Sequence, residues 1–317
     1  MDNVLLEIKN LTKIYEGKGV SVKALSDVSL TVRQGETIGI VGESGCGKTT
    51  LGRCVVRGIE ATSGEVLFHT EEGVIDFLKI KGAQMRKYRK DIQMIFQDPY
   101  ASLDPRMTVF DIISEPLRYN TKMSNKEIEQ AVDRIVDQVG FNKAFLRRYP
   151  HAFSGGQRQR IGIARSLILQ PKLIVCDEAV SALDVSIQAQ IINLLEDLQR
   201  ENNLTYLFIS HALSVVRHIS DRVMVMYLGR MVEFADTEDL FSNPLHPYTK
   251  ALLSAVPQPD PDVEVDRIIL EGEVPNPANP PSGCHFHPRC AYATEKCRKE
   301  APQLTDRNGR LVACWNC

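Results

Sequence analysis

The fold of this chain is decided by residues 37–49, which read TIGIVGESGCGKT. Residues 37–41 are β-branched or small and predict a buried strand. They are followed by the pattern GxxxxGK[ST], a glycine-rich turn that opens a helix, here expected over residues 48–59. Glycines in such a turn let backbone N–H groups close around phosphate oxygens at the start of the helix. The stretch therefore indicates an α/β fold with a phosphate-binding loop.

The side chains of this loop suit a nucleoside triphosphate with Mg²⁺. Lys48 is placed to reach the β- and γ-phosphates, and the Thr49 hydroxyl is placed to bind Mg²⁺. The positive end of the helix dipole adds a favourable partial charge. A purely structural glycine turn is the alternative, which the strand–turn–helix context disfavours. The expected ATP contacts are Gly42, Glu43, Ser44, Gly45, Cys46, Gly47, Lys48, Thr49 and Thr50.

An acidic pair follows a second apolar segment. Residues 173–177 read LIVCD and predict a strand that ends in Asp177, with Glu178 directly after it. A carboxylate at the C-terminal end of a parallel strand faces the ligand crevice of an open sheet. Asp177 would hold Mg²⁺, directly or through water, and Glu178 would orient and polarise the attacking water. Alone the pair is a weak signal, because solvated strand ends often look the same.

A third motif precedes this strand. Residues 154–157 read SGGQ and are expected to begin a helix, with Ser154 as its N-cap. Gly155 and Gly156 would let backbone donors approach a γ-phosphate, and Gln157 completes the motif. An ordinary capped helix would start in the same way. Taken together with the phosphate loop and the acidic pair, the tetrapeptide resembles the signature motif of ABC ATPases, and so does its spacing before the acidic strand.

This resemblance implies roles for further residues. Tyr15 would stack on adenine, and Gln97 would sense Mg²⁺ and couple to membrane subunits. Asp184 would lie in the loop that crosses a dimer interface, and His211 would contact the γ-phosphate. The implied catalytic residues are Glu178, His211 and Gln97, and the implied Mg²⁺ ligands are Thr49, Gln97 and Asp177.

In ABC ATPases, the signature of one cassette completes the phosphate loop site of another, so that ATP is held between two cassettes. This chain carries one set of motifs. The resemblance therefore implies a second ABC ATPase subunit as partner, either an identical copy or a paralogue.

Composition sets limits on the function. The chain has 317 residues, of which 43% are hydrophobic and 25% charged, and its formal net charge is -2. With so small a net charge, we expect no long-range electrostatic attraction to nucleic acid. We also expect no bilayer-spanning segment and no signal peptide, so a membrane role needs separate membrane partners. Short β-branched runs, including residues 206–209, alternate with longer amphipathic stretches up to about residue 250, which favours a largely parallel sheet.

The expected architecture is a P-loop NTPase of the ABC type, with a RecA-like core, an antiparallel β subdomain and a helical subdomain at about residues 98–165. It would occupy residues 1–250. Residues 251–317 would form a proline-rich linker and a small cysteine-rich extension, because seven of the 16 prolines lie between Pro257 and Pro281.

Cysteines crowd the end of the chain. Cys284, Cys290, Cys297 and Cys314 are separated by short intervals, which suits soft metals or an iron–sulfur cluster. The spacing lacks the close CxxC pairs of common zinc ribbons, although Zn²⁺, disulfides and unliganded thiols stay open as alternatives. Substitute ligands would be Cys317, His285 or His287, whereas Cys46, Cys54 and Cys176 are expected to be reduced thiols.

A narrower resemblance covers nearly the whole chain. Residues 97–106, 149–153 (YPHAF), 243–250 (NPLHPYTK) and the cysteine tail resemble the ATPases of oligopeptide and dipeptide ABC importers, in particular their F-type subunit. Ala179 departs from the proline that many ABC proteins have after the catalytic glutamate. The resemblance implies a four-iron four-sulfur cluster on the four tail cysteines. It also implies two integral membrane permease subunits, an extracytoplasmic substrate-binding protein and a peripheral location at the cytoplasmic face of the cell membrane.

The resemblance implies that the chain hydrolyses ATP to power import of oligopeptides or dipeptides. Nickel, glutathione and oligosaccharides are alternative cargoes, because related importers carry them. A soluble ABC ATPase of translation or DNA repair is disfavoured, since those proteins usually have two cassettes or a long coiled-coil insertion. A binding or redox module built on the cysteine tail is disfavoured because the catalytic set is complete.

Overall fold

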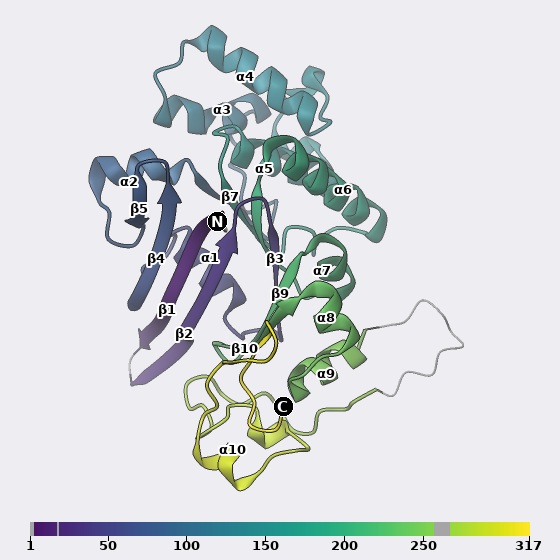
Figure 1. Ribbon diagram of the computed structural model, residues 1–317. Helices are drawn as coiled ribbons and strands as arrows, with labels where there is room; N and C mark the ends of the chain where they lie inside the picture. The colour runs from purple at the N-terminus through teal and green to yellow at the C-terminus, as the bar shows by residue number, and fades with distance from the viewer. Residues whose placement is uncertain (1–2, 18, 257–266) are drawn as a thin grey trace. The chain divides into compact units, whose positions relative to one another are not determined.

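The computed structural model describes residues 3–17, 19–256 and 267–317 (Figure 1). The chain divides into two compact units. The first unit contains Asn3, Arg33–Glu36 and Lys79–Ile209. The second unit contains Val4–Val32, Thr37–Leu78 and the described part of Ser210–Cys317.

The first unit is built on three parallel strands. Strand β7 (Leu173–Asp177) lies between β6 (Ile92–Ile95) and β8 (Thr205–Ile209). Every residue of β7 and β8 is buried. Strands covered on both faces read as continuous apolar runs, which is why LIVCD and TYLFI carry no alternation of polar and apolar residues.

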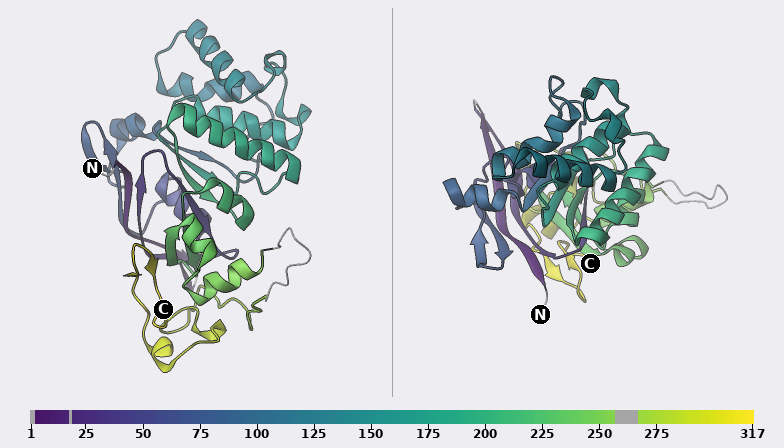
Figure 2. Two further views of the ribbon diagram at one scale, coloured as in Figure 1. Left: turned by 45° about the vertical axis from the view of Figure 1, so that its right-hand side comes forward. Right: turned by 90° about the horizontal axis from the view of Figure 1, so that it is seen from above.

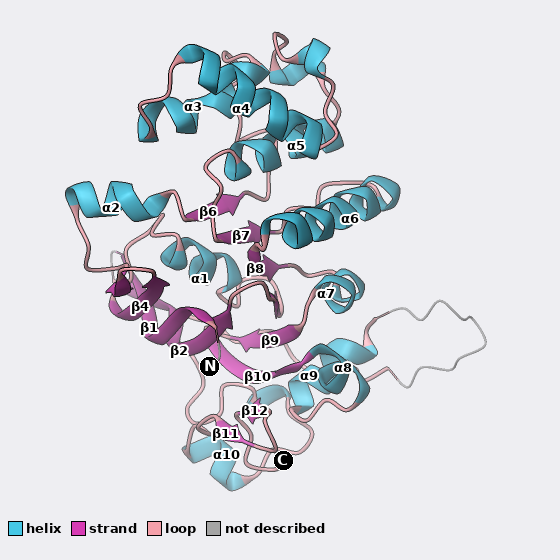
Figure 3. Ribbon diagram, turned by 45° about the horizontal axis from the view of Figure 1, so that its top comes forward, coloured by secondary structure: helices cyan, strands magenta, loops and turns pink. Residues whose placement is uncertain are grey.

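Helices of the first unit include a group of three that pack on one another. Helix α3 contacts both α4 and α5, and α4 begins at a capping box formed by Ser124 and Glu127. The three stay together in both turned views of Figure 2 and in Figure 3. The helices of this unit are α2 (Gly82–Arg89), α3 (Val109–Asn120), α4 (Asn125–Gln138), α5 (Gly155–Leu167) and α6 (Val185–Asn202), with short 3₁₀ turns at Lys143–Phe145 and Pro150–Ala152.

The second unit contains a four-stranded sheet with the order β2-β1-β4-β5. Strand β1 pairs antiparallel with β4, and β4 pairs antiparallel with β5. The antiparallel β subdomain expected from the sequence is therefore confirmed. The strands are β1 (Val4–Gly17), β2 (Val20–Arg33), β4 (Ser63–Thr70) and β5 (Gly73–Asp76).

A second set of strands in this unit carries the phosphate loop. Strand β3 (Thr37–Val41) pairs parallel with β9 (Arg222–Tyr227), and β9 forms an antiparallel hairpin with β10 (Arg230–Asp236). The end of the chain joins this sheet, because β12 (Leu311–Val312) pairs with β10 and β11 (Thr305–Asp306) pairs with β12.

The helices of the second unit are short. Helix α1 ends at Val55, earlier than the expected residue 59, because Arg57 takes a left-handed φ of 54°. The Gly58 N–H then donates to the Arg53 carbonyl, which closes the helix as in a Schellman motif. The helices are α1 (Lys48–Val55), α7 (Leu213–Ile219), α8 (Thr237–Ser242), α9 (Pro247–Ser254) and α10 (Glu295–Lys299), with a 3₁₀ turn at His287–Arg289.

The proline-rich stretch expected at residues 257–281 is described only in part, since residues 257–266 lie outside the described residues. Residues 267–281 contain no helix or strand. Among residues 3–17, 19–256 and 267–317, no helix combines the length and the apolar character that a bilayer crossing requires.

Candidate functional site

The phosphate loop links β3 to α1, and its glycines are sterically required. Gly42 and Gly47 have φ values of 149° and 105°. A Cβ atom at Gly42 would lie 2.2 Å from the Met226 carbonyl oxygen, and one at Gly47 would lie 2.4 Å from that of Ala24. Because Gly47 caps α1 without a side-chain acceptor, the first N–H groups of the helix face the loop without a capping side chain.

Lys48 is buried beneath the loop. Its Nζ donates to the carbonyl oxygens of Gly42 at 2.8 Å and Glu43 at 3.0 Å, which fixes the ammonium group at the base of the turn. Ser44 and Gly45 form the exposed tip of the loop, and Thr49 and Thr50 are half-buried in the first turn of α1. The loop thus places a cation and a helix N-terminus side by side, as triphosphate binding requires.

Two other predicted nucleotide contacts of the second unit lie on the surface. Tyr15 on β1 is 43% exposed, and the Lys13 Nζ lies 4.9 Å from its ring centroid. Tyr15 is therefore a surface residue and not part of the core. His211 is exposed and precedes helix α7.

The acidic pair of the first unit lies at the C-terminal end of β7. Asp177 is buried, and Glu178 takes a left-handed φ of 48°, which non-glycine residues rarely adopt. The Glu178 N–H donates to the Ile209 carbonyl at 2.9 Å, and Gln97 Nε2 donates to Glu178 Oε2 at 2.7 Å. The structure therefore brings together two of the predicted catalytic residues.

The SGGQ motif caps helix α5. Ser154 Oγ accepts from the Gln157 N–H at 3.4 Å, and Gln157 Oε1 accepts from the Ser154 N–H at 3.1 Å, so the two residues form a capping box. Both side chains are exposed. A Cβ atom at Gly156 would lie 2.4 Å from Ile187 Cγ2, so this glycine is required for α5 to pack against α6. Gly155 is half-buried in the same turn.

Asp184 caps the N-terminus of helix α6. Its carboxylate accepts from the Ser186 hydroxyl at 2.7 Å and from the Ile187 N–H at 3.0 Å. These hydrogen bonds, the one from Ser186 above all, lower the pKa of Asp184. The residue is therefore an anionic cap at the start of α6.

One residue beside the signature has a role that the sequence reasoning missed. Arg158 is buried, its Nε donates to the Pro150 carbonyl at 2.8 Å, and its guanidinium lies 3.6 Å from the Tyr100 ring centroid. It ties the loop before the signature to the segment after Gln97. The only signal in the sequence was that both segments belong to the importer-like stretches.

Four thiols converge in the C-terminal extension. A small cavity is lined by Cys284, Cys290, Cys297 and Cys314, together with Phe286, His287 and Trp315. Burial, with the added effect of the other three thiols, raises the pKa of Cys284 to about 11. A hydrogen bond with the Cys317 thiol lowers the pKa of Cys314. Within the described residues, no three His, Cys, Asp or Glu side chains form a ready-made metal site.

The three cysteines outside the extension are buried thiols. Burial raises the pKa of Cys54 to about 11 and raises the pKa values of Cys46 and Cys176 as well. Cys46 lies in the phosphate loop, where its Sγ is 3.9 Å from the Lys48 Nζ. None of these cysteines forms a disulfide.

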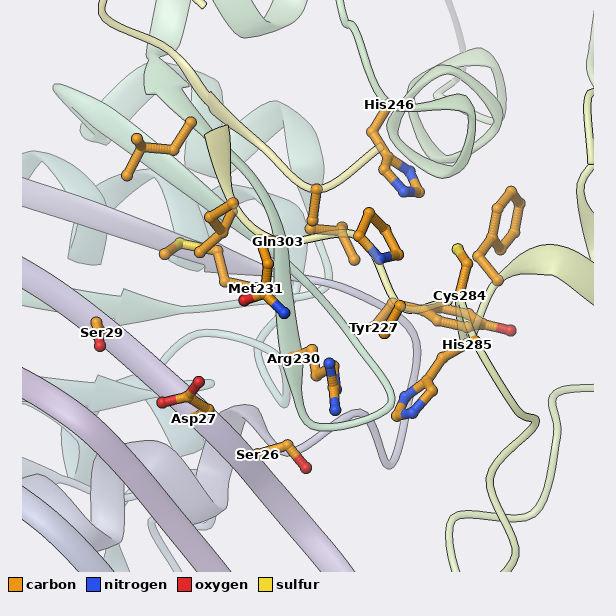
Figure 4. Close-up of a pocket in the computed structure, with 18 residues that line it drawn as sticks. Ser26, Asp27, Ser29, Tyr227, Arg230, Met231, His246, Cys284, His285 and Gln303 are labelled. Carbon is orange, nitrogen blue, oxygen red and sulfur yellow. The ribbon is translucent and has the colours of Figure 1, made fainter. Parts of the chain in front are cut away.

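A larger cavity, of about 340 Å³, lies between the extension and strands β2, β9 and β10 (Figure 4). Arg230 and His285 line it, and Arg230 Nε and His285 Nδ1 are buried without a hydrogen-bond partner in the described part of the chain. Burial and the Arg230 charge lower the pKa of His285 to about 4. Of the two histidines considered as substitute ligands, His287 lines the cysteine cavity and His285 lines this one.

The phosphate loop, the acidic strand end and the capped glycine helix are together the motifs of an ATP-binding cassette. A family model described as "ABC transporter" matches residues 25–181, and one described as "Oligopeptide/dipeptide transporter, C-terminal region" matches residues 232–297. The chain is 28% identical to the ATP-binding cassette MJ0796, whose dimeric structure is in a post-hydrolysis state with ADP and Pi. The TM-score is 0.66, with 73% of this chain and 98% of that chain covered.

Curated relatives narrow the class. The chain is 53% identical to the oligopeptide transport ATP-binding protein OppF of Escherichia coli (strain K12), over 98% of this chain and 96% of the relative. It is 51% identical to the oligopeptide transport ATP-binding protein AppF of Bacillus subtilis (strain 168), with the same coverage. The chain belongs to the family of oligopeptide transport ATP-binding proteins of the OppF and AppF type.

Proposed function

We propose that this chain hydrolyses ATP to power the import of oligopeptides or dipeptides, as the ATP-binding subunit of an ABC importer. The observation that carries this proposal is the 53% identity to OppF over nearly the whole length of both chains. It extends through the C-terminal region that the peptide-transporter family model matches.

In this proposal, Tyr15 stacks on the adenine, and backbone N–H groups within the loop from Gly42 to Thr50 enclose the phosphates. Lys48 neutralises the β- and γ-phosphates. The side chains of Thr49, Asp177 and Gln97 would hold Mg²⁺, which offsets the charge that develops on the phosphate oxygens. These ligands are a hydroxyl, a carboxylate and an amide, the oxygen donors that Mg²⁺ prefers.

Glu178 is the proposed general base. Its carboxylate orients the attacking water, and the hydrogen bond from Gln97 at 2.7 Å supports the position of that carboxylate. His211 contacts the γ-phosphate. Ser154, Gly155, Gly156 and Gln157 of a second cassette, with Asp184 in the loop at the interface, complete the site in trans.

The proposed partners follow from the family. They are a second ABC ATPase subunit, identical or paralogous, two integral membrane permease subunits and an extracytoplasmic substrate-binding protein, with this chain peripheral at the cytoplasmic face of the cell membrane. The dimeric structure of MJ0796 supports the pairing of two cassettes. Nickel, glutathione and oligosaccharides are the alternative cargoes.

We propose further that Cys284, Cys290, Cys297 and Cys314 hold a four-iron four-sulfur cluster, with Zn²⁺ as the alternative. The donor set fits, because four thiols line one cavity. Three of them raise the pKa of the fourth, Cys284, by a repulsion that a bound cation would relieve. The cluster would fasten the extension. Protein purified without oxygen and assayed for iron, sulfide and zinc is expected to contain iron and sulfide, and iron-free, sulfide-free protein would contradict the proposal.

The test of the ATPase assignment is Glu178→Gln. Loss of a general base is expected to reduce ATP turnover by about 100-fold to 10,000-fold while ATP binding is retained. Glu201→Gln, an exposed position on α6, is the matched control and should hydrolyse ATP like the wild type. Undiminished turnover in Glu178→Gln would mean that the base is another residue.

The cargo requires a separate test. The complex purified with its permeases, with the binding protein added, should hydrolyse ATP faster when short peptides are supplied. Ni²⁺, glutathione and an oligosaccharide are the matched competitors. Stimulation by one of these but not by peptides would reassign the cargo and leave the ATPase assignment intact.

A further inference from the structure

A residue of the C-terminal extension holds the phosphate loop. Arg289 Nη1 donates to Glu43 Oε2 at 2.8 Å, and its Nη2 donates to Glu43 Oε1 at 3.1 Å. The Arg289 side chain is 8% exposed and that of Glu43 is 27% exposed. This two-bond geometry fixes the direction of the carboxylate as well as its distance, because the guanidinium is a planar fork.

The backbone of Glu43 is held from the same side. Its N–H donates to the hydroxyl oxygen of Tyr248 at 2.8 Å, and Arg289 Nη1 lies 3.5 Å from the Tyr227 hydroxyl. The rings of Tyr227, Tyr248 and Phe286 pack on one another with centroids 4.7 to 5.4 Å apart. Both the main chain and the side chain of one loop residue are therefore fixed by residues from the C-terminal part of the chain.

Glu43 connects this contact to the cation of the loop. Its carbonyl oxygen accepts from Lys48 Nζ at 3.0 Å, so Arg289, Glu43 and Lys48 form a continuous chain of polar contacts. The Glu43 carboxylate belongs to the loop that encloses phosphates. An unpaired negative charge at this position would repel a triphosphate, and the Arg289 guanidinium cancels that charge.

Arg289 also lies within the loop from Cys284 to Cys290, called here the cysteine loop. It directly precedes Cys290, which lines the cysteine cavity with Cys284, Phe286 and His287. The Cys284 N–H donates to the Cys297 carbonyl at 2.8 Å, which closes this loop onto α10. The residue that pairs with Glu43 is therefore covalently bonded to one of the four cysteines that line the cavity.

We propose that Arg289 is a positioning residue for ATP binding: through its two hydrogen bonds to Glu43, the C-terminal extension holds the phosphate loop in its binding shape and neutralises its carboxylate. The proposal rests on nucleotide binding by the loop and is independent of what the cysteines hold. It gives the extension a role in the affinity for ATP.

The test measures the dissociation constant of Mg-ATP by calorimetry on the full-length protein. Arg289→Gln removes the charge of a partly buried pair and is expected to weaken ATP binding about tenfold or more. Arg289→Lys keeps the positive charge but cannot form the two parallel hydrogen bonds to Glu43. It should therefore retain much of the affinity for ATP that Arg289→Gln loses. Arg307→Gln, an exposed arginine of the same extension, is the control and should bind like the wild type.

A double-mutant cycle separates the pair from a general loss of structure. In the Glu43→Gln background there is no carboxylate to cancel, so adding Arg289→Gln should change the ATP affinity by less than about threefold. An equal loss of affinity in both backgrounds, or wild-type affinity in Arg289→Gln alone, would overturn the proposal. If Arg289→Gln does not melt cooperatively, Arg289→Lys is compared in the same two backgrounds, and its smaller loss of affinity should be present with Glu43 and absent with Glu43→Gln. A wild type that binds no ATP would instead contradict the proposed function.

Discussion

The phosphate loop and the cysteine-rich extension lie in the same unit but are held by different interactions. The loop is fixed by its main chain, with left-handed glycines between β3 and α1. The extension from Gly283 to Cys317 has two-residue strands and a five-residue helix, and it is fixed by side chains such as Arg289 and Arg310. The loop has no room for a Cβ atom at Gly42 or Gly47, whereas the extension depends on a few polar side-chain pairs.

The largest effect on ATP hydrolysis is expected from a methyl group added at Gly47 of the phosphate loop. A Cβ atom at Gly47 would lie 2.4 Å from the Ala24 carbonyl at a φ of 105°, so Gly47→Ala must displace the backbone. A shift of about 1 Å at a reacting site costs roughly 100-fold, and we expect at least that loss in kcat/KM for ATP.

Gly45→Ala is the matched control. Gly45 also has a positive φ, of 78°, but its added Cβ would meet nothing within 4 Å. Its loss in kcat/KM should stay below about tenfold, the cost of a left-handed alanine alone. Equal losses of kcat/KM in Gly45→Ala and Gly47→Ala would show that steric clash of the added Cβ atom does not determine the effect.

In the extension, the largest effect is expected at Arg310. Its Nη2 donates to Glu233 Oε1 at 3.1 Å, and the Glu233 side chain is fully buried. Glu233 also accepts from the N–H groups of Leu245 and His246 at 2.8 and 2.9 Å. Arg310→Ala leaves this carboxylate without its counter-charge and is expected to lower the free energy of unfolding by about 3–5 kcal/mol, measured by urea denaturation.

The control for this variant is Arg310→Ala combined with Glu233→Gln. Without the buried charge, the amide should restore part of the lost stability. A single variant Arg310→Ala with the wild-type urea midpoint would show that the pair does not anchor the extension.

A pH effect is expected from His246. Burial lowers the pKa of His246 from 6.5 to about 4. Between these values the unfolded chain binds a proton that the folded chain does not, so stability is fully present above about pH 6.5. It falls as the pH drops toward 4, by up to about 3 kcal/mol.

His246→Asn removes this titration and keeps an acceptor for the Tyr248 N–H, which now donates to His246 Nδ1 at 3.0 Å. The slope of the unfolding free energy between pH 6.5 and 4 should become shallower in this variant. The half-buried His285, whose pKa is also lowered, contributes a slope of the same sign and remains in both proteins. An unchanged slope would show that His246 does not couple folding to pH.

The smallest effect is expected at Tyr248. Tyr248→Phe keeps the ring but removes the oxygen that accepts from the Glu43 N–H, a loss of about 1 kcal/mol. The KM for ATP should rise by roughly fivefold. Tyr292→Phe, at an exposed tyrosine of the extension, should leave the KM unchanged.

Features encoded by neighbouring residues could be predicted from the sequence. The strands expected at residues 37–41 and 173–177 match β3 and β7, and the ABC fold class is confirmed by the comparisons. A run of apolar residues predicts a buried parallel strand, and the spacing of its glycines predicts a phosphate loop. The predicted roles of the site residues stay predictions.

Features that depend on distant residues could not be predicted. Arg289 and Glu43 are 246 positions apart, and neither residue type at its position indicates a partner. The strand β12 has two residues, too few for an alternation pattern. Helix α1 ends early, at Val55, because Arg57 adopts a left-handed backbone conformation. The neighbouring sequence does not predict that conformation.

The proposed function requires two cassettes that enclose ATP. The nucleotide would lie between the phosphate loop of one cassette and the start of helix α5, at Ser154–Gln157, of the other. The most direct measurement is the structure of Glu178→Gln with ATP and Mg²⁺, in complex with its partner subunits. We expect the γ-phosphate to contact Lys48 of one cassette and the signature serine, Ser154 in this chain, of the other. ATP bound entirely within one cassette, with Ser154 far from any phosphate, would contradict it.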